Sequence, residues 1–113
     1  MSVIFGFVGI RPEERSLSEV AMRLTSAFGI DFEFDESGKY EELPAYCAQA
    51  LGIQFALLGL PEQQLVETAE PMTDFTLQVL SLDNLREGED MDLSDYLARL
   101  ISRCAKLEAY VLK

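Results

Sequence analysis

Apolar residues recur along this chain at two different periods, and these periods predict its secondary structure. Continuous or alternating apolar runs are typical of strands, which we expect at 3–8, 30–35, 53–58 and 74–82. Apolar residues three or four positions apart are typical of helices, which we expect at 17–28, 43–51 and 93–104. Residues 62–72 are expected to be mainly a connector, and 83–90 an acidic loop. The tail at 107–112 fits either a last strand or the end of the third helix.

Two of the helices have sequence signals at their ends. Ser16 and Glu19 have the spacing of a capping box, and Gly29 is suited to the left-handed residue that ends a helix. Asp92 is expected to cap the third helix, with Asp95 in its first turn.

The predicted order is β-α-β-α-β-β-α, with one further strand if 107–112 is a strand. This order predicts a single α/β (α+β) domain over 1–113, built as a two-layer sandwich. Its mixed sheet would have four to five strands, covered on one face by two main helices. Within 30–35, Ile30, Phe32 and Phe34 are expected to point inward, and Asp31, Glu33 and Asp35 to face solvent. The expected core residues are Ile4, Phe7, Leu24, Phe28, Phe32, Leu57, Val79, Leu97, Leu100 and Ile101.

The charge balance narrows the class of partner. The chain has 20 acids against 9 bases, a net charge of −11. Direct binding to nucleic acid or to an anionic membrane needs clustered Lys and Arg, so both are disfavoured. The class of partner that the negative charge favours is a basic protein. No run reaches the ~18 apolar residues that span a bilayer, and no basic residue precedes the apolar N-terminus as in a signal peptide. We therefore expect a cytoplasmic protein.

Catalytic and metal-binding chemistry have little support in the sequence. There is no His, which excludes imidazole-based triads and His-based zinc sites. The carboxylates at 90 and 92 could contact a divalent cation, but they lack the further ligands of a calcium loop. Cys47 and Cys104 are expected on the apolar stripes of helices as buried thiols, with a disulfide or a reactive thiol as the alternatives. We expect no cofactor, no metal and no enzymatic activity.

The acidic residues are concentrated in two segments, 31–42 and 83–95. Each has six acids and one base, so together they account for nearly all of the net charge. The candidate partner-binding residues are Glu87, Glu89, Asp90, Asp83, Asp92, Asp95, Glu36, Glu41 and Glu42. Acidic loops also keep proteins soluble, and acids favour helix starts, so a purely structural role is the alternative. We expect the 83–92 loop to matter more than the acidic strand face, because Glu87, Glu89 and Asp90 have no evident structural role.

The chain as a whole resembles the small acidic α/β immunity proteins of bacterial contact-dependent growth inhibition and polymorphic toxin systems. The resemblance covers its size, acidic balance, early strand and lack of catalytic groups, together with segment 42–55, interpreted as a short helix running into a strand. It implies a cytoplasmic antitoxin that binds and neutralises one cognate toxin domain, often a basic nuclease. The alternatives are an acidic binding module, such as a nucleic-acid mimic or a secretion-chaperone-like protein, and a small enzyme.

Overall fold

The computed structural model describes residues 4–36, 44–60, 74–81 and 90–112. The first half of the chain forms β1 (Ile4–Arg11), α1 (Leu17–Phe28), β2 (Glu33–Phe34), β3 (Ala45–Ala50) and β4 (Ile53–Leu58). The second half forms β5 (Phe75–Ser81), β6 (Met91–Asp92), α2 (Ser94–Leu100), a π-helix (Ile101–Ala105) and β7 (Glu108–Val111).

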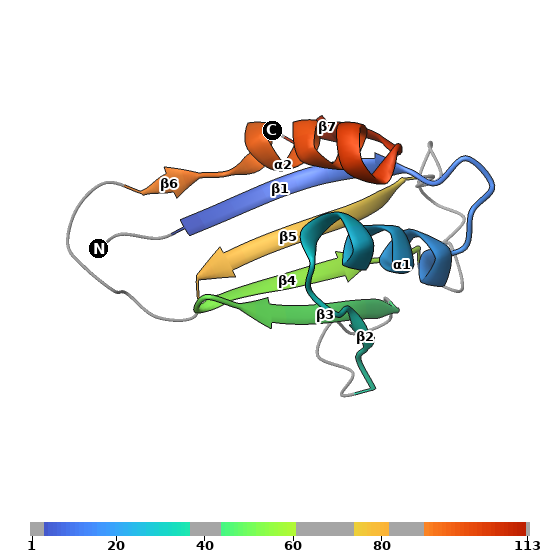
Figure 1. The fold of residues 1–113 in the computed structure, drawn as a ribbon, viewed down its shortest axis with the longest axis horizontal. Coiled ribbons are helices and arrows are strands. Elements are labelled where there is room, and N and C mark those ends of the chain that lie inside the picture. The colour runs from blue at the N-terminus through green and yellow to red at the C-terminus, as the bar shows by residue number, and fades with distance from the viewer. Residues whose placement is uncertain (1–3, 37–43, 61–73, 82–89, 113) are drawn as a thin grey trace, which may run out of the picture.

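The seven strands of the described residues belong to one sheet, in the order β2-β3-β4-β5-β1-β6, with β7 also paired to β1 (Figure 1). Strand β6 pairs with Ile4 and Phe5 in parallel, whereas β7 pairs antiparallel with residues 8–11. The two short strands therefore follow one another along the same edge of β1. The predicted α/β (α+β) sandwich with a mixed sheet and two main helices is confirmed, but the sheet has more strands than the four to five expected.

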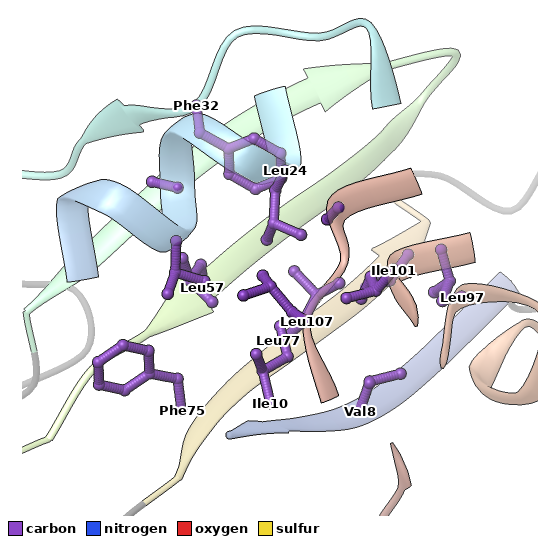
Figure 2. Packing of buried hydrophobic residues seen from close by; sticks show 14 of the residues in the cluster. Val8, Ile10, Leu24, Phe32, Leu57, Phe75, Leu77, Leu97, Ile101 and Leu107 are labelled. Atoms are coloured by element: carbon purple, nitrogen blue, oxygen red, sulfur yellow. The ribbon is translucent and has the colours of Figure 1, made fainter. Parts of the chain in front are cut away.

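Both described helices pack on one face of the sheet (Figure 1). Figure 2 shows side chains from β1, β4 and β5 meeting those from α1 and from the C-terminal helical segment, which consists of α2 and the π-helix, in one apolar layer. Of the expected core residues, six are buried: Leu24, Phe32, Leu57, Val79, Leu97 and Ile101. Four are only half-buried: Ile4, Phe7, Phe28 and Leu100. Among these, Phe7 lies on the opposite face of the sheet, because side chains alternate along β1 and Val8 points into the core.

Helix α1 begins and ends as its sequence signals predict. The Ser16 hydroxyl accepts a hydrogen bond from the Glu19 backbone N–H at 3.2 Å. Gly29 closes the helix in the left-handed region with φ 72°, and its N–H donates to the Thr25 carbonyl at 2.9 Å.

The predicted helix at 43–51 is wrong, because this segment is strand β3 in a hairpin with β4. Leu51 and Gly52 both have positive φ, as the two central residues of a tight hairpin turn require. Gly52 therefore turns the chain between two strands rather than ending a helix. Cys47 is consequently half-buried on a strand instead of lying on a helical stripe.

The predicted strand at 30–35 is shortened to Glu33–Phe34 at the edge of the sheet. Phe32 is buried as expected, and Asp31 and Glu33 are exposed. The inward prediction for Phe34 is wrong, since its side chain is 52% exposed and packs edge-on against Tyr46 at a ring-centroid distance of 5.5 Å. Asp35 is half-buried rather than exposed.

The third predicted helix changes type before it ends. Helix α2 runs only to Leu100 and continues as the π-helix, whose wider turn buries Ala105 after Ile101 and leaves Cys104 exposed. The prediction of a buried Cys104 is therefore wrong. Lys106 then takes a left-handed conformation with φ 54° and leads into β7, which decides in favour of a last strand.

Candidate protein-binding site

The described parts of the two acidic segments lie at opposite edges of the sheet. Glu33 is on β2 and Asp92 is on β6, the first and last strands of the order. Five inter-strand steps of roughly 4.8 Å separate these strands by about 24 Å. Among the described residues, the acids therefore form two separate surfaces rather than one.

Several of the candidate residues fall outside the described part of the chain. These are Asp83, Glu87, Glu89, Glu41 and Glu42. On the β2 side, Glu36 is exposed just after the strand. On the β6 side, Asp90 and Asp92 are both exposed, and Met91 between them is 50% exposed. The predicted dominance of the 83–92 loop stays a prediction.

Asp92 is held in place by the residue that begins α2. Its Oδ1 accepts a hydrogen bond from the Ser94 backbone N–H at 2.9 Å. Hydrogen bonds from the Ser94 hydroxyl and the Ser94 backbone lower the pKa of the Asp92 carboxyl. Helix α2 begins one residue later than predicted, and its N-cap is Leu93 rather than Asp92. The Asp92 carboxylate instead forms an Asx turn with Ser94, which stabilises the backbone just before the helix.

Ser94 also joins α2 to the sheet. Its side chain is only 3% exposed, and its hydroxyl accepts the Phe7 backbone N–H at 2.9 Å. Phe7 lies between the stretches of β1 that pair with β6 and β7. The hydroxyl therefore takes the place of a strand partner in that gap, and a single residue connects β1, α2 and the Asp92 carboxylate.

Asp95 lies in the first turn of α2, as predicted. Its carboxylate forms an ion pair with Arg99 one turn later, with Nε and Oδ2 3.3 Å apart. The charge of Asp95 is therefore partly compensated within its own helix.

The sheet face opposite the helices carries an apolar row beside the β6 acids. Phe5 is in register with Leu80 on one side and with Asp92 on the other, so the three residues lie across β5, β1 and β6. Leu80 is 44% exposed, and Phe5 and Phe7 are half-buried with ring centroids 6.2 Å apart. We call Phe5, Phe7 and Leu80 the aromatic face. Further along this side of the sheet, a small cluster of Ala45, Ala56 and Leu58 is buried.

This face was not predicted from the sequence. The continuous apolar run at 3–8 predicts a strand without indicating a side in contact with solvent, whereas the described helices cover only one side of it. A usable signal was present in β5, where Thr76 and Gln78 alternate with the core residues and indicate a face in contact with solvent.

A second group that was not predicted from the sequence lies at the far end of β1. The Tyr110 ring lies over Gly9, its partner in register, and a Cβ at Gly9 would overlap with the ring. The Tyr110 hydroxyl donates to the Asp74 carboxylate, and the Arg11 guanidinium lies 5.9 Å from the ring centroid. The hydrogen bond to Asp74, partial burial and the Asp74 charge raise the pKa of Tyr110. Arg11 also pairs with Glu108 at 3.0 Å. A glycine within a strand was the available signal, since it marks close approach of another group.

Two further observations concern the described residues. No group of three or more Asp, Glu or Cys side chains in them is arranged to hold a metal ion. None of their helices has the length and apolar character needed to cross a membrane. Comparison of the chain with protein-family models, with curated proteins and with solved structures found no match.

Proposed function

We propose that this chain is an immunity protein that binds and neutralises one basic toxin domain in the cytoplasm, without catalysing a reaction itself. The observation that carries the proposal is the position of Asp92 on β6, with Asp90 just before that strand, beside the aromatic face. Asp92 is the register neighbour of Phe5, and Phe5 is the neighbour of Leu80. A row of half-buried and exposed apolar groups thus ends in the Asp92 carboxylate.

Protein interfaces combine an apolar centre with a polar or charged rim. Phe5, Phe7 and Leu80 supply the apolar centre, because their burial against a partner would release water from apolar surface. Asp90 and Asp92 supply a rim of negative charge. The net charge of −11 would speed encounter with a partner of opposite sign.

A nuclease-type toxin has such an opposite charge, because its substrate groove holds phosphates with Lys and Arg. Carboxylates presented on a rigid strand can occupy the positions of those phosphates. Asp92 suits this role, since its hydrogen bonds with Ser94 favour the ionised form and fix the carboxylate before binding. Pre-organisation lowers the entropic cost of association.

Co-expression with the protein encoded by the neighbouring gene tests the proposal. We expect that neighbour to be toxic alone and harmless when this chain is present. Leu80→Lys places a positive charge within the aromatic face and should abolish rescue. Met22→Lys is the matched control, because Met22 is 71% exposed on α1, over the other face of the sheet, and rescue should persist. A neighbour without toxicity, or full rescue by a folded Leu80→Lys variant, contradicts the proposal.

The same pair of proteins tests which acids dominate. Reversing Glu87, Glu89 and Asp90 to Lys should weaken toxin binding more than reversing Asp31, Glu33 and Asp35, with little effect on thermal stability. Titration calorimetry at two salt concentrations measures both triple variants. A larger loss of affinity for the 31–35 variant would assign the interface to the β2 edge.

A further inference from the structure

A groove of about 480 Å³ runs between the last strand and the C-terminal helical segment, away from the aromatic face. Its helical wall consists of Asp95, Ala98, Arg99, Ser102 and Arg103, and its other wall of Ala109, Tyr110 and Val111. Three consecutive strand residues can line one groove only where the groove follows the edge of the strand, because neighbouring side chains point to opposite faces. The groove therefore lies along β7.

The backbone of β7 is available on this side. Leu112 donates its N–H to the Phe7 carbonyl at 3.0 Å, which places residue 112 among those bonded to β1. Alternate residues of an antiparallel strand bond to the same neighbour, so Tyr110 bonds to β1 and the N–H and C=O groups of Ala109 and Val111 point outward. Among the described strands, β7 pairs with β1 alone. Within the described part of the chain, the groove thus contains a strand edge with no paired neighbour.

The helical wall is shaped to leave room for a chain. Ala98 and Ser102 are one turn apart and small, so the floor beside β7 stays open. Arg99 and Arg103, also one turn apart, extend from the same wall. Arg99 forms an ion pair with Asp95, whereas Arg103 has no ion pair within the described ranges. In a chain of net charge −11, this groove is therefore lined by two cations against one acid.

We propose that this groove is a docking site for an extended peptide segment rich in carboxylates, which adds to the edge of β7 as a further strand of the sheet. Backbone hydrogen bonds to Ala109 and Val111 would hold the segment, and side-chain carboxylates would reach Arg99 and Arg103. The inference goes beyond the proposed toxin binding, because the groove lies away from the aromatic face and has the opposite charge preference.

A second copy of this chain is the competing occupant. Two copies joined edge to edge through β7 would be related by a two-fold axis, which brings the same patch of each against the other. Arg99 and Arg103 would then face their own equivalents. Like charges in contact disfavour this arrangement, so the charge of the groove selects an acidic segment of another protein.

The experiment uses the full chain and a phage-displayed library of random decapeptides, followed by fluorescence anisotropy on the selected peptides. We expect selection of peptides with Asp or Glu at alternating positions. Arg103→Glu should weaken their binding at least tenfold, and Arg15→Glu, the same charge change on the connection before α1, should leave it unchanged. Ala109→Pro removes an outward N–H that makes no bond to β1 and should weaken binding about two- to tenfold. Methylation of alternate backbone nitrogens of the peptide should abolish binding, independently of how the protein variants fold.

Amide hydrogen exchange gives a second readout of the same site. In the free chain, the amides of Ala109 and Val111 should exchange faster than that of Tyr110, and bound peptide should protect both. Failure to select acidic peptides, or equal binding by wild type and Arg103→Glu, would overturn the site. Self-association of the free chain through β7 would overturn the choice of occupant. Loss of toxin binding would leave each of these results unaffected, so the two proposals can fail separately.

Discussion

Replacing Ser94 by Ala should destabilise the protein more than its small size suggests. The hydroxyl accepts the Phe7 N–H at 2.9 Å, and the side chain is 3% exposed. Alanine removes the acceptor, fills nearly the same space and leaves the amide without a partner at the junction between β6 and β7. An unsatisfied buried donor costs about 1–3 kcal/mol. We expect about 1–2 kcal/mol, because the bond itself is only partly buried.

Urea unfolding monitored by circular dichroism measures this free energy, and each kcal/mol should lower Tm by roughly 3–6 °C. Ser102→Ala is the matched control, because Ser102 is exposed on the π-helix and its loss should change stability by less than about 0.5 kcal/mol. The variant has a second readout, since losing the Ser94 hydroxyl should move the pKa of Asp92 back toward 3.8. An effect equal to that of the control, together with an unchanged Asp92 titration, would refute the bridging role of Ser94.

Three further predictions concern other parts of the molecule. Leu97→Ala should cost about 2–5 kcal/mol of unfolding free energy, measured in urea, because Leu97 is buried in the main core; a cost below ~1 kcal/mol would place it outside that core. Gly9→Ala should push the Tyr110 ring away from Asp74 and lower the raised Tyr110 pKa toward 10.0, as followed by phenolate absorbance with Tyr110→Phe to assign the signal. The folded-state pKa of Asp92 is lowered, so its ionised form contributes stability above pH 3.8 that is lost as pH falls through the folded pKa. The stability advantage of wild type over Asp92→Asn should accordingly shrink in urea titrations below pH 3.8, and a constant difference would contradict it.

Local signals predicted some elements to the residue. Helix α1 begins after Ser16 and ends before Gly29, and β4 occupies 53–58. In both cases the signal lies within the element itself, as a cap, a stop or a run of apolar residues. Such signals act before any tertiary contact forms.

Strand β3 was mispredicted because its pattern fits two structures. Tyr46, Cys47 and Ala50 have helical spacing, but both sides of β3 are partly buried in the sheet, which hides the alternation of a strand. Only the pairing with β4 decides between the two, and pairing is a tertiary property. Strand β6 has two residues and is too short to show any period.

The candidate site depended on the same kind of information. The order of residues in the sequence shows that the acids are concentrated in two segments. Only the strand order shows that β2 and β6 lie at opposite edges of the sheet. The aromatic face was hidden for a related reason. Whether a strand such as β1 is covered on one face or two depends on where the helices pack, and Phe5 and Phe7 fit either case.

The position of β1 in the sheet has a consequence for the order in which the protein can fold. Its contacts span the chain: Phe7 bonds to a residue 87 positions later, and Arg11 pairs with one 97 positions later. During synthesis, the first strand therefore leaves the ribosome long before β7 exists to cover its edge. Folding dominated by such distant pairings is slow, so apolar surface and unpaired strand edges stay exposed for longer and can aggregate. We expect nascent chains that stop before β7 to depend on chaperones, whereas release of the last strand should allow the whole sheet to close in one cooperative step.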